Sequence, residues 1–254
     1  MDFISTIPLA NGCSVIASDD CGLIAINKKA GRASHPNGPR PDRPAMVMAA
    51  YNFDREYFSW IDDGGIKRRL YLINRLDAPT SGVILASSTA EAAAAAKAQF
   101  RNKAVEKTYA AIILGKLRPE RGLWTDRIST SRIGGRLRSR AGGPAAHAAA
   151  TSYEVEEFGQ NGANLTFVKL SPKTGLTHQL RLQCALRRHP ILGDATYGDF
   201  AANKRFRALS KIDRLFLHCL RTSLTIELDG KSVEFSAEAP LPESFGAAIN
   251  GAKF

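Results

Sequence analysis

Arg75 and Asp77 place a guanidinium and a carboxylate two residues apart in a short polar stretch of the chain. Apolar runs at residues 71–73 and 83–86 flank this stretch and read as short buried strands. The stretch between them is therefore predicted to be a loop, since Gly82 permits a turn that other residues resist. A carboxylate in such a place can add to an electrophilic carbon or stabilise positive charge. The bland alternative is a surface ion pair on a turn.

Composition narrows the class of protein. The chain has 254 residues, of which 44% are hydrophobic, so it can form one large domain or two small ones. A formal net charge of +11 favours a polyanionic partner such as nucleic acid. No apolar run reaches the roughly 18 residues that span a bilayer, and no basic amphipathic helix stands out, so no membrane partner is expected. Residues 1–8 lack the pattern of a signal peptide, which predicts a cytoplasmic protein.

Patterning along the chain predicts a series of strands with few helices. Strands are predicted at residues 22–31, 105–115, 148–158, 163–170, 224–228 and 233–236, and helices at residues 45–51, 90–103 and 177–188. Ser88 and Glu91 match a capping box before the second helix, and Thr177 is the predicted N-cap of the third. Lys107 and Tyr109 fall on one face of their strand, because side chains alternate with a period of two.

Residues 116–147 are rich in glycine and arginine and show no apolar period. They are either a solvated linker or a basic hairpin that lies along phosphates. With the surplus positive charge, Arg136 and Arg138 are predicted to contact RNA. A further candidate RNA surface consists of Lys204, Arg205, Arg207, Lys211 and Arg214.

Several short motifs occur in a fixed order between about residues 22 and 242. Residues 74–82 resemble HRLDxxTSG, with Asn74 in place of the first His. Residues 27–31 resemble the motif NKPAG, and residues 107–109 resemble K-x-Y. Residues 174–183 resemble TGRTHQIRVH, with Leu176 in place of Arg. Residues 189–198 resemble HPIxGDxxYG, and residues 215–219 resemble LxLHA. Together they resemble the pseudouridine synthase family that modifies large-subunit ribosomal RNA and transfer RNA. The order of the motifs is far more specific than any one of them.

The resemblance implies a fold and an activity. The expected fold is α+β, the pseudouridine synthase fold, in which a bent, mostly antiparallel mixed sheet with flanking helices carries a central catalytic cleft. One catalytic domain is expected over residues 1–254, with its core at about 22–242 and without an appended S4-type RNA-binding domain. The implied activity is isomerisation of a specific uridine in structured rRNA or tRNA to pseudouridine. No obligate protein partner is evident.

The resemblance also implies roles for single residues. Asp77 matches the catalytic Asp, Arg181 the Arg that pairs with it, and Tyr109 the Tyr that packs against the target uracil. Leu217 matches an apolar residue that lines the uracil pocket. Arg75 is predicted to fill the space vacated by the flipped nucleotide or to hold its phosphate. The substrate-binding candidates are Arg75, Leu76, Lys107, Leu217, His178, Arg136 and Arg138.

The implied reaction breaks the bond between uracil N1 and ribose C1′, turns the base and rejoins it through C5. It is redox-neutral and needs no cofactor. Whether Asp77 adds to C1′ or helps to form a glycal stays open. His178 and His189 have no carboxylate or cysteine cluster at ligand spacing, and the four cysteines lack CxxC spacing, so no metal site is expected and the thiols are predicted to be buried and reduced.

Two other classes of function compete with this reading. A noncatalytic RNA-binding protein on the same fold is favoured only by the departures at Asn74 and Leu176. A carboxylate-dependent glycosidase needs a second catalytic carboxylate. Asp194 is available for that role, but its glycine-containing turn predicts an architectural residue.

Overall fold

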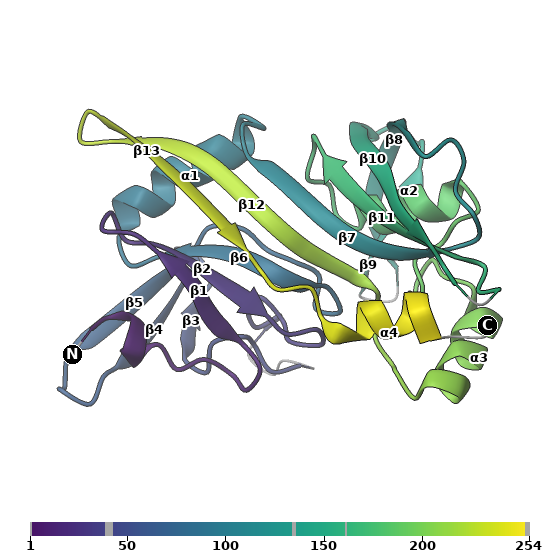
Figure 1. Cartoon of the computed structure of the whole chain (residues 1–254). Helices are drawn as coiled ribbons and strands as arrows, with labels where there is room; N and C mark the ends of the chain where they lie inside the picture. Colours follow the sequence, from purple (N-terminus) through teal and green to yellow (C-terminus); the bar gives the residue numbers. More distant parts are fainter. Residues whose placement is uncertain (1, 39–42, 134–135, 161, 252–254) are drawn as a thin grey trace. The chain divides into compact units, whose positions relative to one another are not determined.

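The structure is a computed structural model that describes residues 2–38, 43–133, 136–160 and 162–251 (Figure 1). The chain divides into two compact units. Unit 1 comprises Met1–Glu106 and Cys219–Pro240, and unit 2 comprises Lys107–His218 and Leu241–Phe254. The expectation of a single catalytic domain over the whole chain stays a prediction.

Unit 1 is built mainly of antiparallel strands. Its elements are η1 (Ile4–Thr6), β1 (Ser14–Ser18), β2 (Leu23–Lys28), β3 (Ala50–Asn52), β4 (Tyr57–Ile61), β5 (Lys67–Leu72), β6 (Ser81–Ser87), α1 (Ala90–Arg101), most of β12 (Leu217–Leu228) and β13 (Lys231–Glu238). Strand β2 pairs with β1 and β6, β5 pairs with β4 and β6, β4 pairs with β3, and β12 pairs with β13, all antiparallel. Every residue of β6 is buried, which explains its uninterrupted apolar pattern.

Two predictions in unit 1 need correction. Residues 45–51 form no helix: the amide of Met46 donates to the Ala33 carbonyl, and Val47 forms a bridge with Leu9. Since their backbone groups bond to distant parts of the chain, they are not available for a helix. The second correction concerns the cap of α1. Its N-cap is Thr89, whose hydroxyl accepts the Ala92 amide, rather than the predicted Ser88.

Unit 2 is built of antiparallel strands and helices. Its elements are β7 (Glu106–Leu114, with Glu106 in unit 1), β8 (Arg121–Ile133), β9 (Arg136–Ala141), β10 (His147–Phe158), β11 (Leu165–Pro172), α2 (Gln179–Leu186), α3 (Phe200–Ser210) and α4 (Glu243–Gly251). The strand order is β7-β11-β10-β8-β9, with every one of these pairs antiparallel. The arginine-rich segment is therefore a hairpin, β8–β9, and not a linker.

Helix α2 starts one residue later than predicted. Its N-cap is His178, which has a left-handed backbone (φ 54°) and no capping hydrogen bond from its side chain, instead of Thr177. The loop before it is closed by the buried Gln179, whose Oε1 accepts the Leu176 amide and the Thr174 hydroxyl. The buried amide side chain of Gln179 thus takes the place of a local capping residue. The spacing of residues in the sequence does not predict this substitution of one device for the other.

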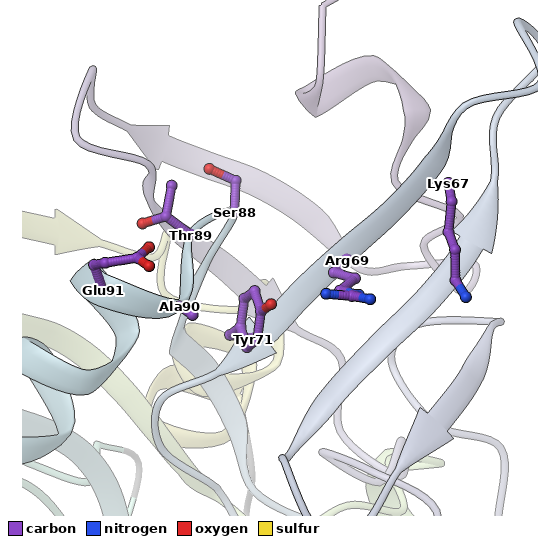
Figure 2. Close-up of a pocket in the computed structure, with 7 residues that line it drawn as sticks. All are labelled: Lys67, Arg69, Tyr71, Ser88, Thr89, Ala90 and Glu91. Atoms are coloured by element: carbon purple, nitrogen blue, oxygen red, sulfur yellow. The ribbon is translucent and has the colours of Figure 1, made fainter.

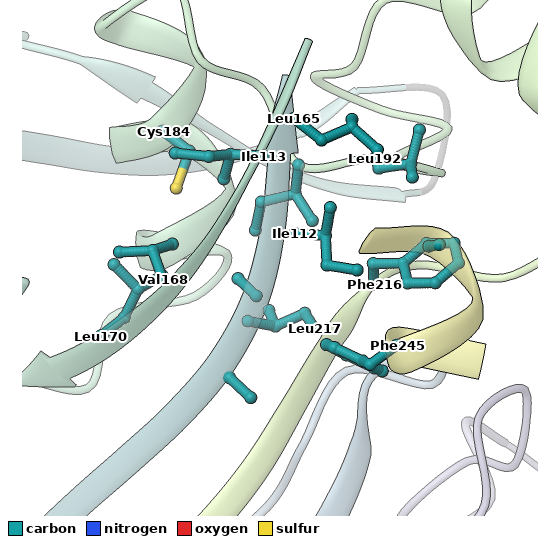
Figure 3. Packing of buried hydrophobic residues seen from close by; sticks show 14 of the residues in the cluster. Ile112, Ile113, Leu165, Val168, Leu170, Cys184, Leu192, Phe216, Leu217 and Phe245 are labelled. Atoms are coloured by element: carbon teal, nitrogen blue, oxygen red, sulfur yellow. The ribbon is translucent and has the colours of Figure 1, made fainter. Parts of the chain in front are cut away.

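The core of unit 2 lies between its sheet and its helices. Figure 3 shows part of its buried cluster, in which Ile112 of β7 lies near Phe216, and Val168 of β11, Leu217 and Phe245 belong to the same cluster. Helices α3 and α4 and strands β1 and β4 were not predicted, and β12 extends over Leu217–Leu228 where only residues 224–228 were predicted as a strand. The α+β, mostly antiparallel class is confirmed.

Cys184 and Cys219 are buried, as predicted, whereas the predicted burial of Cys13 and Cys21 is wrong, since both are only half-buried. Within the described ranges, no helix is long and apolar enough to cross a membrane.

Candidate active site

The backbone on both sides of Asp77 is fixed by the segment that follows β2. The hydroxyl of Ser34 donates to the Leu76 carbonyl at 2.8 Å and accepts the Leu76 amide at 3.0 Å. The amide of Gly31 donates to the Ala78 carbonyl at 2.8 Å. Asp77 itself is half-buried and Leu76 is buried, so the loop presents the carboxylate from a rigid support.

Lys28 anchors the same loop from below. Its side chain is fully buried, and its ammonium donates to the carbonyls of Lys29, Arg32 and Ala78 at 2.8 to 3.1 Å. Three carbonyl acceptors compensate the cost of burying a charge, because an ammonium has three protons to donate. The positive charge of Lys28 is therefore hydrogen-bonded to Ala78, the residue that follows Asp77.

We expect Lys28→Met to lower the free energy of unfolding by about 2–4 kcal/mol, because it leaves the buried carbonyls without donors. Urea denaturation measures this change. The matched control is Lys29→Met, since Lys29 is the next residue in the chain and is exposed; it should stay within about 0.5 kcal/mol of the unsubstituted protein. Equal stabilities for the two variants would contradict the anchoring role.

The glycine of the TSG triplet has a steric cause. Gly82 has φ 107°, and a Cβ there would lie 2.1 Å from the carbonyl oxygen of Cys219 in β12. Only glycine permits this approach. Asn74, which replaces the usual His, has a structural partner: its Oδ1 accepts the Leu85 amide of β6 at 2.8 Å. The hydrogen bond to β6 thus accommodates Asn74 at the position where the motif has His.

Arg181 makes a buried bidentate ion pair in unit 2. Its Nε lies 2.7 Å from Oδ2 of Asp194, and its Nη2 lies 2.8 Å from Oδ1. Arg181 is 5% exposed and Asp194 is fully buried. Burial by itself would raise the pKa of Asp194, but the hydrogen bonds and charge of Arg181, with the amides of Tyr197 and Thr196, hold that pKa below its usual range. The fork geometry fixes the guanidinium plane.

Tyr197 joins the basic hairpin to the start of α2. Its hydroxyl accepts the Ser139 amide of β9 at 2.8 Å and forms a hydrogen bond with Nδ1 of His178 at 2.9 Å. The Arg181 guanidinium carbon lies 5.5 Å from the centre of the Tyr197 ring. The Ser139 hydroxyl also donates to the Thr177 carbonyl at 2.6 Å. The hairpin is therefore tied to the helix that carries Arg181.

The remaining candidates in unit 2 differ in accessibility. Lys107 and Tyr109 lie on β7 and are both half-buried, with Tyr109 packed against the core cluster of this unit. Leu217 is only 4% exposed and belongs to the same cluster (Figure 3). Arg138 is half-buried and lies near the Thr196 carbonyl, at 3.5 Å. The side chain of Arg136 lies outside the described residues.

Leu176, which replaces the usual Arg, is stabilised by apolar packing, whereas Asn74 is stabilised by a hydrogen bond. It is partly buried against a small apolar cluster formed by Ile128, Ala149 and Leu182. The second departure from the motifs thus also has a structural partner.

A pocket of about 490 Å³ lies elsewhere in unit 1 (Figure 2). Lys67, Arg69 and Tyr71 of β5 line it together with residues 88–91 at the start of α1. The pocket carries both signs of charge, because Glu91 faces it as well as the two basic side chains. It contains none of the predicted site residues. Among the described residues, no three His, Cys, Asp or Glu side chains gather in a way that could hold a metal.

Comparison with known proteins decides the family. The family model described as RNA pseudouridylate synthase matches residues 22–186. The chain is 30% identical over 233 residues to tRNA pseudouridine synthase C of Pasteurella multocida, which covers 87% of this chain and 90% of that protein. It is 33% identical to tRNA pseudouridine synthase C of Haemophilus influenzae over 212 residues, 80% of this chain and 83% of that protein. The chain belongs to the RNA pseudouridylate synthase family.

Solved structures agree with this assignment. Human RNA Pseudouridylate Synthase Domain Containing 1 superposes with a TM-score of 0.69 at 24% identity, covering 94% of this chain and 88% of that one. Human RNA Pseudouridylate Synthase Domain Containing 4 gives a TM-score of 0.62 at 22% identity. At these identities the likeness shows the fold, so the predicted pseudouridine synthase fold is confirmed. The protein is an isomerase that acts on RNA.

Some parts of this pseudouridine synthase site were not foreseen. Asp194 was predicted to be architectural, and its pairing with Arg181 was not predicted. Ser34 and Tyr197 were not singled out at all, because a lone Ser or Tyr in a loop carries no chemical pattern. Their only signal in the sequence is their position inside or next to a motif. The structure identifies them through hydrogen bonds that join segments distant in sequence.

Proposed function

We propose that this pseudouridine synthase modifies a uridine in transfer RNA. Support comes from its relatives, several of which are named tRNA pseudouridine synthase C and match at 30–33% identity over most of their length. The net charge of +11 suits a polyanionic substrate of that size. A cytoplasmic location, where transfer RNA is processed, is part of the proposal.

The single observation that carries the proposed mechanism is the rigid support of Asp77 within its motif. Asp77 is the proposed catalytic carboxylate, which adds to ribose C1′ or stabilises positive charge there. Arg181 is proposed to pair with it, Tyr109 to hold the uracil face and Leu217 to keep water from the intermediate. Asp77 belongs to unit 1 and the other three to unit 2. These roles rest on the motifs and on how each unit holds its own residues.

The remaining candidates are proposed to bind the substrate. Arg75 either fills the space left by the flipped nucleotide or holds its phosphate. Leu76 directly precedes Asp77 in the sequence, and Lys107 lies two residues before Tyr109. His178 is proposed to contact RNA at the start of α2. We propose that both units work as one catalytic domain.

The chemistry balances without a cofactor. The bond between N1 and C1′ breaks, a bond between C5 and C1′ forms, and the proton lost from C5 is balanced by the proton gained at N1. No electron leaves the base or the sugar, so no oxidant or reductant is required. Isomerisation leaves the mass of the RNA unchanged, whereas a glycosidase would release free uracil and a noncatalytic RNA-binding protein would do neither.

The test is pseudouridine mapping of total RNA from cells that lack the protein, complemented with the unsubstituted gene or with Asp77→Ala. We expect one or a few transfer RNA positions to lose pseudouridine and to regain it only with the unsubstituted gene. Loss at a ribosomal position instead would move the substrate to ribosomal RNA. Persistence of every site would contradict the assignment of this chain to RNA modification in those cells.

The hairpin β8–β9 is proposed to lie along the RNA backbone. We expect the double variant Arg136→Glu with Arg138→Glu to bind transfer RNA about tenfold more weakly at moderate salt. The slope of the logarithm of the binding constant against the logarithm of the salt concentration should fall by the equivalent of about two phosphate contacts. Filter binding at several salt concentrations measures both. Arg55→Glu with Lys231→Glu, two exposed residues in unit 1, provides the charge-matched control. Equal losses in the two double variants would show a general charge effect only.

A further inference from the structure

His35 contacts the side chain of Arg75 in unit 1. Its Nε2 lies 3.2 Å from Nη1 of Arg75, and its Nδ1 lies 2.7 Å from the carbonyl oxygen of Pro36. A guanidinium can only donate and a carbonyl oxygen can only accept. Both contacts are hydrogen bonds only if Nδ1 carries the proton and Nε2 carries a lone pair. The geometry therefore selects the neutral imidazole with its hydrogen on Nδ1.

The ring of His35 is held in place by stacking. The ring centres of His35 and Tyr51 lie 5.1 Å apart, with 16° between the ring planes. Tyr51 in turn packs on the fully buried Phe58 of β4, with ring centres 4.8 Å apart. Burial and the negative charge of Glu56 raise the pKa of Tyr51 to about 12 against the opposing effect of Arg75, so this ring stays neutral. The His35 imidazole is thus stacked on Tyr51, which in turn packs against a core residue.

Arg75 needs such support more than its neighbours do. Its side chain is exposed, whereas Leu76 next to it is buried and fixed by Ser34. A free arginine side chain samples many rotamers, and this conformational entropy is lost when the side chain is ordered on a ligand. Residues 34 and 35 together hold the backbone and the side chain of the residues just before Asp77. This support removes part of that entropy before RNA binds.

We propose that His35 is a positioning residue for pseudouridine formation, and that its neutral imidazole holds the Arg75 guanidinium in the orientation that meets the RNA beside the target uridine. The inference rests on the proposed function of Arg75. His35 touches no reacting atom and acts through Arg75.

Protonation of His35 reverses the contact. A protonated imidazole has no lone pair on Nε2, so it cannot accept from Arg75 and adds a second positive charge beside it. Tyr51 interacts electrostatically with Arg75, and Glu56 interacts with both members of the pair. Glu56 is already paired with Lys97 at 2.6 Å, and its pKa is lowered by that hydrogen bond first and by Arg75 and His35 further. The contact with Arg75 therefore requires the neutral form of His35.

The first experiment compares kcat and KM on transfer RNA for the unsubstituted enzyme, His35→Gln and His35→Ala between about pH 5.5 and 8. Glutamine can place an acceptor oxygen near the position of Nε2 but does not titrate. We expect His35→Ala to lose about tenfold in kcat/KM near pH 7.5, and His35→Gln to lose less than about threefold. His147→Gln, at an exposed position on β10, is the matched control.

Two kinetic results would overturn the proposal: activity of His35→Ala equal to that of the unsubstituted enzyme, or a loss in His35→Gln as large as that in His35→Ala. A second measurement needs no catalysis. Long-range proton–nitrogen NMR spectra of the free protein should show His35 with its hydrogen on Nδ1, and Arg75→Ala should shift these signals. Hydrogen on Nε2 would exclude the contact. If the unsubstituted enzyme forms no pseudouridine, the proposed function fails while the NMR result still judges the contact.

Discussion

Asp77→Ala is expected to abolish pseudouridine formation, with a loss of at least about 10³-fold in the single-turnover rate, because the variant lacks the group that acts at C1′. Binding of transfer RNA should change by no more than about threefold, since the electrostatic contacts of the basic surfaces remain. Tritium release from C5-labelled uridine measures the rate, and filter binding measures the affinity. The separation of rate from affinity is the mark of a catalytic group.

The control for this variant is Asp63→Ala, which removes an exposed carboxylate elsewhere in unit 1. It should leave the rate unchanged. Retention of more than about a tenth of the activity by Asp77→Ala would show that the loop serves only to position RNA. A parallel loss of stability, measured by thermal denaturation, would show instead that the loop had unfolded. The backbone bonds from Ser34 and Gly31 do not involve the Asp77 side chain, so we expect the fold to be retained.

Asp194→Ala is expected to lower the free energy of unfolding by about 3–5 kcal/mol, because it leaves the buried Arg181 guanidinium without its bidentate partner. Activity should fall with it, since the orientation of Arg181 is lost. Asp213→Ala is the matched control. Asp213 also pairs with an arginine, Arg207, but both side chains are largely exposed, so the expected cost is below about 1 kcal/mol.

A double-substitution cycle separates the pair from its surroundings. Arg181→Met with Asp194→Leu removes both charges and should be less destabilising than either single change, because no uncompensated charge stays buried. Additive losses would contradict a strong interaction between the two residues. Urea denaturation at neutral pH gives all the values needed.

The same pair predicts a dependence of stability on pH. The pKa of Asp194 in the folded protein lies below its usual range. The carboxylate therefore stabilises the fold fully above the unfolded value of about 4, and this contribution is lost as the pH falls through the folded pKa. Asp194→Asn should accordingly show a flatter loss of stability in acid than the unsubstituted protein.

The sequence by itself determined the family and most of the sheet. The motifs stand in one order, and the apolar runs that flank Asp77 became β5 and β6 as predicted. Local patterns were reliable where burial was uniform along a segment, because a strand buried on both faces needs apolar residues at every position. The sequence also marked Gly82 as a position of unusual backbone freedom, which its φ of 107° confirms, although its close approach to Cys219 is a tertiary contact.

Tertiary structure decided what depends on partners distant in sequence. Residues 45–51 have the composition of a helix, but their backbone bonds to residues 8–10 and 33 override that preference. The helix start at His178 is set by Gln179 in a buried network and not by a local cap. The pairing of Arg181 on α2 with Asp194 and the tautomer of His35 follow from side-chain hydrogen bonds made in the folded chain. Such geometry is absent from the linear pattern, because propensity and spacing report only on neighbours along the chain.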